Sequence, residues 1–168
     1  MTPLPASMDP RAPFIAWRID KQVHANEWDS GAGARLSGGR WNPKGMSVVY
    51  CSLDPATCIL ESAVHKGFDV LDIQPHVLTR MRVVDPGAIK LIGPSDVANP
   101  AWLHAGLPSA GQQDWGASLL EAHPFVIVPS VVSRHSWNLV FQPSLARGKY
   151  QLVDQERLAI DGRLNPPR

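Results

Sequence analysis

Alternation of apolar and polar positions predicts a series of short strands along this chain. Residues 14–19 (FIAWRI) and 76–84 (HVLTRMRVV) alternate between two faces, whereas residues 125–132 (FVIVPSVV) form the most hydrophobic run and are typical of a central strand. Pro129 cannot donate to a sheet ladder, so this strand should end or bulge there and hold Ser130 in a special backbone position. The strands predicted from the pattern are residues 14–19, 46–51, 76–84, 89–92, 125–132, 136–143, 150–153 and 157–160.

Two helices are predicted between these strands. Asp54 followed by Pro55 is a strong helix start, because aspartate caps the first turn and proline fits the first helical position, and Gly67 ends the same helix. Glu61 should lie at the margin of the packed face of this helix. The second helix is expected over residues 113–122. The apolar stripe predicted for the first helix consists of Ala56, Ile59, Leu60, Ala63 and Val64.

Composition places these elements in one α+β domain. The 168 residues are 44% apolar and 18% charged, which suits a packed globular chain, and 16 prolines and 13 glycines favour short elements joined by many turns. We therefore expect a single compact domain over residues 14–168, with a central mixed or antiparallel β-sheet flanked by short helices. Residues 1–13 contain four prolines and no apolar periodicity, and predict a flexible N-terminal arm.

The charge balance argues against nucleic acid and membranes as direct partners. The chain has 16 basic and 15 acidic residues, a net charge of +1, so no overall field attracts a polyanion. No apolar run reaches the roughly 18 residues of a membrane-spanning helix, and the first residues lack the apolar segment of a secretory signal. Cys51 and Cys58 lie within apolar runs, which indicates reduced, buried thiols and a cytoplasmic protein.

Residues 20–45 form the most distinctive predicted loop. They carry five glycines, which is typical of a binding loop, and within them residues 38–40 (GGR) combine close backbone approach with a guanidinium that can grip a phosphate or carboxylate. Taken alone, this tripeptide is also typical of a turn with a surface arginine. Arg18, in the first strand, either lies at a sheet edge in water or lines an anion-binding cleft. A second loop with one helical turn is expected over residues 93–112.

The residue pattern gives less support to two other kinds of site. Glu61 and His65 lie one helical turn apart and could form half of a metal site, but no other cluster of His, Cys or Asp supplies the remaining ligands, so we expect no metal. A serine hydrolase using Ser130 with His65 or His135 is disfavoured, because Ser130 lacks the G-x-S-x-G turn of such enzymes.

As a set, the motifs resemble the RES domain family, named for its arginine, glutamate and serine. Their order is a strand, a GGRWN loop, a strand ending in tyrosine, a helix with glutamate, a Pro-Ser strand and a Trp-Asn strand, and the resemblance covers roughly residues 14–155. The chain departs from many relatives at Gln142, where the family more often has asparagine before the proline. The matching residues are Gly38, Gly39, Arg40, Trp41, Asn42, Gly45, Val49, Tyr50, Cys51, Ser52, Leu60, Glu61, His65, Val128, Pro129, Ser130, Val131, Val132, Trp137 and Asn138.

This resemblance implies a fold similar to that of the ADP-ribosyltransferases and an enzyme that acts on NAD. Family members are mostly toxins of bacterial toxin–antitoxin pairs, and they consume NAD by phosphorolysis or hydrolysis or transfer ADP-ribose to a protein. NAD is then the substrate, and no separate cofactor is implied. The expected partner is an antitoxin with an Xre-like helix-turn-helix domain that blocks the active site. The alternative is a catalytically inert module that binds a nucleotide or a partner at the same place.

The resemblance also suggests the role of each site residue. Cleavage of the nicotinamide–ribose bond creates an oxocarbenium-like centre that a carboxylate stabilises, so Glu61 is expected at the ribose. Arg40 suits the diphosphate and Tyr50 suits a wall for the nicotinamide ring, while Arg18 or Arg35 could share the role of Arg40. Catalytic roles are expected for Arg40, Tyr50 and Glu61, and substrate contacts for Arg18, Gly39, Trp41, Ser130 and Asn138. The side chains expected to converge on one cleft are those of Arg40, Tyr50, Glu61, Ser130 and Asn138.

Overall fold

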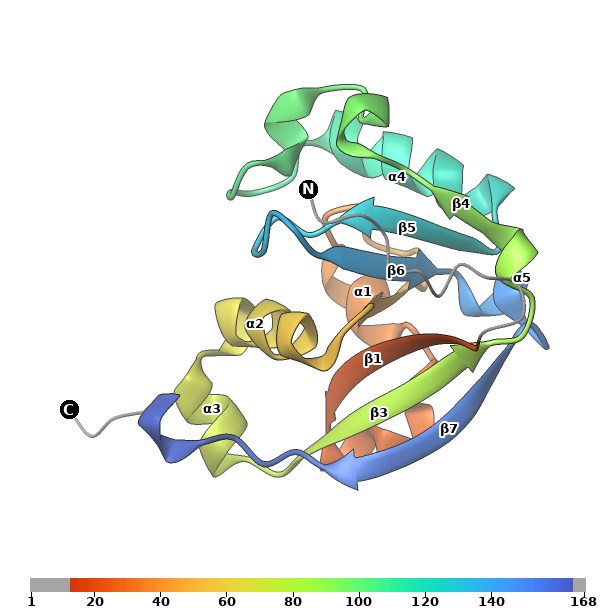
Figure 1. Ribbon diagram of the computed structural model, residues 1–168. Helices are drawn as coiled ribbons and strands as arrows, with labels where there is room; N and C mark the ends of the chain where they lie inside the picture. The colour runs from red at the N-terminus through yellow and green to blue at the C-terminus, as the bar shows by residue number, and fades with distance from the viewer. Residues whose placement is uncertain (1–12, 165–168) are drawn as a thin grey trace.

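One mixed sheet of seven strands organises the molecule (Figure 1), which is a computed structural model that describes residues 13–164. The strand order is β4-β5-β6-β2-β1-β3-β7, and β4 and β5 form the parallel pair among otherwise antiparallel neighbours. This arrangement confirms the predicted α+β domain with a mixed sheet. The strands are β1 (Phe14–Lys21), β2 (Val49–Ser52), β3 (His76–Val83), β4 (Ile89–Leu91), β5 (Phe125–Pro129), β6 (Trp137–Phe141) and β7 (Tyr150–Arg157).

The helices are short and follow the strands closely. Asp54 caps α2 as predicted, because its Oδ1 accepts a hydrogen bond of 2.7 Å from the backbone N–H of Thr57, and Gly67 ends the helix with a φ of 85°. The α-helices are α1 (Ala32–Ser37), α2 (Pro55–Lys66), α3 (Phe68–Ile73), α4 (Ala110–Ala122) and α5 (Pro143–Ala146). The 3₁₀ helices are η2 (Gln22–Glu27), η3 (Pro86–Ala88), η4 (Pro94–Asp96), η5 (Pro100–Leu103) and η6 (Gly162–Leu164).

The sheet consists of two halves that meet between β1 and β2. Their register contains one residue pair, Trp17 with Ser52, whereas β1 pairs with β3 along all eight of its residues. Helix α2 packs against both β1 and β2, and in Figure 1 it lies between the β5–β6 half above and the β1–β3 half below. The start of α2 is therefore held at the place where the two halves separate.

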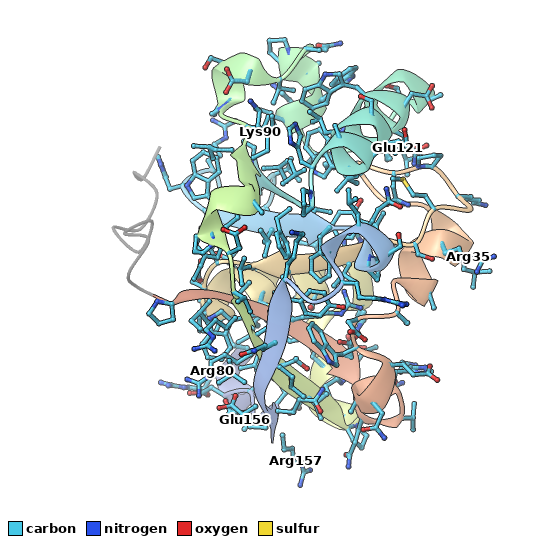
Figure 2. The ribbon with its side chains drawn as sticks, turned by 90° about the vertical axis from the view of Figure 1, so that its right-hand side faces the viewer. Arg35, Arg80, Lys90, Glu121, Glu156 and Arg157 are labelled. Carbon is cyan, nitrogen blue, oxygen red and sulfur yellow. The ribbon has the colours of Figure 1, made fainter. Side chains whose placement is uncertain are left out.

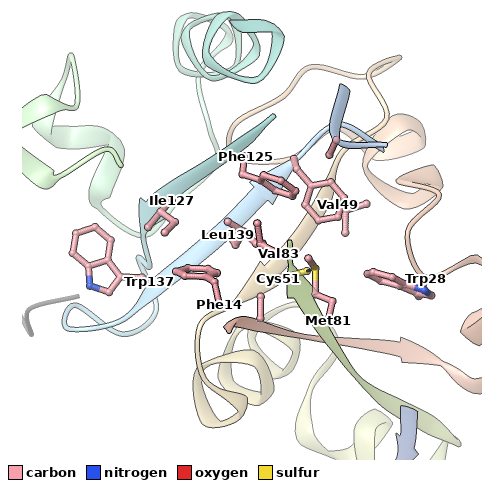
Figure 3. Packing of buried hydrophobic residues seen from close by; sticks show 13 residues of the cluster. Phe14, Trp28, Val49, Cys51, Met81, Val83, Phe125, Ile127, Trp137 and Leu139 are labelled. Carbon is pink, nitrogen blue, oxygen red and sulfur yellow. Dashed lines mark hydrogen bonds between the residues drawn. The ribbon is translucent and has the colours of Figure 1, made fainter. Parts of the chain in front are cut away.

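Strand β5 is buried on both faces, which explains its uninterrupted apolar sequence. Phe125 and Ile127 pack into a core between the two halves of the sheet, where they meet Leu139, Phe14 and Met81 (Figure 3). The alternate residues of β5 face α4 and form a second core. That second core consists of Trp41, Val48, Ile92, Val97, Leu120, Val126, Val128 and Val140. The strand ends at Pro129, as predicted from the missing backbone donor.

The predicted apolar stripe of α2 is only partly correct, because Ile59 and Ala63 pack against a buried cluster whereas the other three members are exposed. Leu60 is 40% exposed and Val64 is 64% exposed, whereas the buried residues of the helix are Thr57 and Cys58. The helix also directs Glu61 toward its hydrogen-bond partners, which lie in β6 and just after β5. Buried polar side chains need hydrogen-bond partners, and the periodicity of apolar residues does not detect this requirement.

Several boundaries also differ from the sequence-based prediction. The loop expected over residues 20–45 contains η2 and α1, and α3 was not predicted. The two C-terminal strands are one strand, β7, whose pairing with β3 shifts between Arg80 and Met81. The second helix begins three residues earlier than expected, at Ala110, and the strand predicted from residue 46 begins at Val49. Apart from Pro13, the predicted N-terminal arm lies outside the described residues.

Both cysteines are buried and unpaired, which confirms the prediction of buried thiols. Burial raises the pKa of the Cys51 thiol to about 12 and also raises that of Cys58. Among residues 13–164 no helix is both long and apolar enough to cross a membrane.

We expect Gly116→Ala to destabilise the fold. A Cβ atom at this position of α4 would lie 2.4 Å from the carbonyl oxygen of Trp41, and a backbone neighbour cannot simply rotate away. Overpacking of this kind costs about 1–3 kcal/mol of the free energy of unfolding, which urea titration measures. Gly111→Ala in the same helix is the matched control, because nothing lies within 4 Å of its Cβ position. Equal stability of the two variants would contradict the contact between α4 and the Trp41 backbone.

Candidate active site

Glu61 accepts two hydrogen bonds on a single carboxylate oxygen. Ser130 Oγ donates to Oε1 at 2.8 Å, and Asn138 Nδ2 donates to the same oxygen at 2.6 Å. Within the described part of the chain, no donor is bonded to Oε2. The two donors fix the carboxylate by one oxygen and leave the other for a further donor.

Ser130 is oriented by the tight turn that follows β5. Its side-chain oxygen accepts hydrogen bonds from the backbone N–H groups of Val132, at 3.2 Å, and Ser133, at 3.0 Å. Because these bonds occupy the acceptor sites of the hydroxyl, its proton is directed to Glu61. Ser130 is 3% exposed, so this donor is shielded from water. Ser130 follows Pro129, the last residue of β5, and opens the turn between β5 and β6.

Tyr50 ties its strand to the glycine-rich loop. Its hydroxyl donates to Asn42 Oδ1 at 2.7 Å and accepts from the backbone N–H of Trp41 at 3.1 Å. A Cβ at Gly39 would lie 2.4 Å from the Tyr50 hydroxyl oxygen, so only glycine leaves room for it. Burial raises the pKa of Tyr50 still further above neutral, so its hydroxyl is a hydrogen-bond donor. The tyrosine hydroxyl is thus an anchor for the loop that carries Arg40.

Arg40 is held by backbone carbonyl groups of the segment before α4. Its Nη1 donates to the carbonyl oxygens of Trp102 (3.1 Å) and His104 (3.3 Å), and its Nη2 donates to that of Gly106 (3.1 Å). Partial burial lowers the pKa of Arg40, while the nearby negative charge of Glu61 acts in the opposite direction. No hydrogen bond or ion pair joins the side chains of Arg40 and Glu61.

Comparison with known proteins bears on this arrangement. The model of the RES domain matches residues 15–161 of the chain. The chain belongs to the RES domain family. A "Prs ADP-ribosylating toxin" of Sphingobium sp. is 32% identical over 138 residues, covering 76% of this chain and 81% of the relative. A "Toxin Res" of Photorhabdus laumondii is 26% identical over 162 residues, covering 90% and 97%.

A solved structure supports the same fold for this RES chain. The toxin–antitoxin complex MbcT–MbcA of M. tuberculosis contains a chain that superposes with a TM-score of 0.63 at 21% sequence identity. The superposition covers 87% of this chain and 84% of the other.

The structure brings some predicted site residues of this RES chain together and separates others. Glu61, Ser130 and Asn138 form one bonded cluster. Tyr50 and Arg40 belong to a second group, built on residues 39–42, that is linked to Glu61 by charge and not by a hydrogen bond. Arg35 is exposed on α1, and its side chain points outward in Figure 2.

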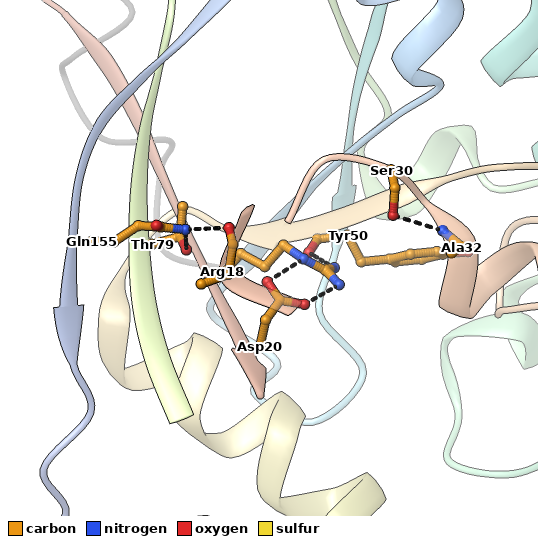
Figure 4. A network of polar contacts seen from close by, with 8 residues as sticks. Arg18, Asp20, Ser30, Ala32, Tyr50, Thr79 and Gln155 are labelled. Carbon is orange, nitrogen blue, oxygen red and sulfur yellow. Dashed lines mark hydrogen bonds and ion pairs between the residues drawn. The ribbon is translucent and has the colours of Figure 1, made fainter. Parts of the chain in front are cut away.

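The structure does not give Arg18 a free guanidinium for a phosphate. Its Nε and Nη2 donate to the carboxylate of Asp20 at 2.8 and 2.6 Å, and its Nη1 donates to the carbonyl oxygen of Tyr50 at 3.0 Å (Figure 4). Burial lowers the pKa of Arg18, but the ion pair with Asp20 outweighs it and the net shift is upward. Arg18 supports the backbone of Tyr50 from the first strand, and the substrate contact expected of it stays a prediction.

Trp41 is a core residue in this structure. Its side chain is 4% exposed and packs in the cluster beneath α4, with its ring centroid 5.9 Å from that of Trp115. The motif predicted a substrate contact for Trp41, and this contact stays a prediction. In the structure the buried side chain of Trp41 packs in the core. His65 and His135 are exposed, and among the described residues neither is a hydrogen-bond partner of Ser130, so no Ser-His pair forms.

Two polar residues of the site received no role from sequence reasoning. Asn42 is fully buried and anchors Tyr50, and Ser52 Oγ donates to Asn138 Oδ1 at 2.8 Å. Both belong to the motifs of the family resemblance. The signal for Ser52 was its place directly after the strand predicted over residues 46–51, but its partner depends on the register between β2 and β6, which pairs Ser52 with Asn138.

We expect Tyr50→Phe to lower the free energy of unfolding by about 1–3 kcal/mol, because the Trp41 N–H and Asn42 Oδ1 would both lose a buried partner. Thermal and urea unfolding measure the loss. Tyr150→Phe is the control: its hydroxyl has one bond, to Asp29 Oδ2, and should cost less. Unchanged stability of Tyr50→Phe would contradict the anchoring role.

Proposed function

We propose that this chain is a toxin that consumes NAD by breaking the bond between nicotinamide and ribose. Membership of the RES domain family and the toxin names of its relatives support the proposal. The observation that carries it is the Glu61 carboxylate, held through Oε1 by Ser130 and Asn138 with Oε2 left for another donor. A fixed carboxylate of this kind suits a sugar whose hydroxyls need an acceptor during bond cleavage.

The chemistry follows from charge development at the ribose. As nicotinamide leaves, its ring takes the electrons of the glycosidic bond and the ribose carbon becomes electron-deficient, like an oxocarbenium ion. Glu61 would stabilise this positive charge and accept a hydrogen bond from a ribose hydroxyl. The guanidinium of Arg40 would bind the diphosphate of NAD, and the ring of Tyr50 would face the nicotinamide.

The acceptor of ADP-ribose defines the reaction class. Water gives an NAD glycohydrolase, phosphate gives an NAD phosphorylase, and a protein side chain gives an ADP-ribosyltransferase. The name of the Sphingobium relative supports transfer to a protein. In each case NAD is a substrate that is consumed, and we propose no separate cofactor. Residues 13–164 contain no group of three or more His, Cys, Asp or Glu placed to hold a metal ion.

An antitoxin is the proposed partner. The similar fold in the MbcT–MbcA complex comes from a toxin–antitoxin pair, and this supports a partner protein, which we propose blocks the site. We propose that this partner carries an Xre-like helix-turn-helix domain, and that the toxin acts on NAD in the cytoplasm.

Glu61→Gln tests the proposed function. The amide oxygen can still accept from Ser130 and Asn138, so the fold should be kept, but the negative charge at the ribose is lost. We expect the rate of nicotinamide release to fall by about 10²–10³-fold with a small change in KM, because the lost interaction acts mainly in the transition state. Glu121→Gln is the matched control, since Glu121 is an exposed glutamate on the surface of α4 (Figure 2).

Three reactions separate the acceptors: NAD in buffer, NAD with phosphate, and labelled NAD with a cell extract that lacks the antitoxin. Nicotinamide release in the first, ADP-ribose phosphate in the second or labelled protein in the third assigns the class. Folded wild-type protein that binds NAD saturably and turns it over in none of the three would contradict the proposal and favour an inert binding module.

A further inference from the structure

Ser52 is a buried hydroxyl that the proposed chemistry does not use directly. It is 3% exposed and lies at the end of β2, where the register with β6 places it directly opposite Asn138. Directly paired residues of neighbouring strands have side chains on the same face of the sheet. Ser52 Oγ donates to Asn138 Oδ1 at 2.8 Å across this pair.

Asn138 passes this contact on to the carboxylate. Its amide has one acceptor end, which Ser52 occupies, and one donor end, which is bonded to Glu61 Oε1 at 2.6 Å. The carboxylate accepts only, so it fixes which end of the amide faces it. Ser52 supplies the donor that the other end needs, and it thereby resists rotation of the amide away from Glu61.

The second donor to Glu61 is fixed in a different way. Ser130 is oriented by two backbone N–H groups of its own turn and needs no side chain to hold it. Asn138 has its two side-chain bonds with Ser52 and Glu61. Of the two groups that hold the carboxylate, Asn138 is therefore the one whose orientation depends on another residue.

We infer that Ser52 is a positioning residue of the proposed reaction, which holds the Asn138 amide so that Glu61 presents its other oxygen to the ribose. This inference rests on the proposed NAD cleavage for its effect on rate. The hydrogen-bonded chain from Ser52 through Asn138 to Glu61 does not depend on the identity of the substrate.

Ser52→Ala removes the donor and leaves a small side chain in the same place. We expect the kcat for nicotinamide release to fall about ten- to a hundredfold, the usual scale for a group that orients a site residue, with KM within about twofold. Ser52→Thr keeps the hydroxyl and should restore kcat to within about threefold of wild type. Thr79→Val is the matched control, because Thr79 is a fully buried hydroxyl of the same sheet bonded to Gln155 and not to the site.

A second readout does not require turnover. The side-chain amide of Asn138, assigned in ¹⁵N NMR spectra by its disappearance in Asn138→Asp, should exchange its protons with solvent slowly in the wild type. Ser52→Ala should speed this exchange, and Thr79→Val should leave it unchanged. Ser52→Cys, which has a similar size and a weak donor, gives a second variant with the same expected direction if Ser52→Ala does not fold.

The outcomes are distinct. Wild-type kcat in Ser52→Ala, or a loss confined to KM, overturns the inference, and so does an Asn138 amide that is unaffected. Absence of turnover in the wild type contradicts the proposed function; in that case faster amide exchange in Ser52→Ala still supports the positioning of Asn138, and unchanged exchange overturns it.

Discussion

The two hydrogen bonds that meet on Glu61 Oε1 are the contacts on which the site depends. A partly buried carboxylate is costly unless donors compensate for the lost water, and Ser130 and Asn138 supply them from the end of β5 and the start of β6. The same bonds tie α2 to one half of the sheet, while Cys58 packs with Ile19 of β1 in the other half. The polar cluster therefore joins the two halves where their strand pairing is reduced to one residue pair.

A second set of close contacts positions the loop that carries Arg40. Tyr50 can reach Asn42 only because Gly39 has no side chain, and α4 can approach the Trp41 backbone only because residue 116 is glycine. From the neighbouring strand β1, the guanidinium of Arg18 donates a hydrogen bond to the carbonyl oxygen of Tyr50. The glycine-rich segment that carries Arg40 is thus held by contacts on several sides, although its composition alone is also typical of a mobile loop.

Local signals in the sequence predicted the local parts of the structure. The alternation over residues 76–84, the cap at Asp54 and the strand end at Pro129 depend on neighbouring residues, and the structure confirms them. The inward face of α2 could not be predicted, because Glu61 is bonded to residues 69 and 77 positions away in the sequence. The same holds for the bond of Arg18 to the Tyr50 carbonyl and for that of Ser52 to Asn138, which depend on strand register and not on sequence spacing. Motif resemblance named Glu61, Ser130 and Asn138 together, but only the fold shows that they share one oxygen.

The most direct measurement of the central claim is a crystal structure of the Glu61→Gln variant with NAD bound. The account predicts that a hydroxyl of the nicotinamide ribose lies within hydrogen-bond distance, about 2.6–3.2 Å, of the side chain at position 61, while Ser130 and Asn138 still contact that side chain from the opposite side. The nicotinamide ring should lie beside Tyr50 and the diphosphate near Arg40. NAD bound elsewhere on the molecule, or bound with its nicotinamide ribose turned away from position 61, would contradict the account.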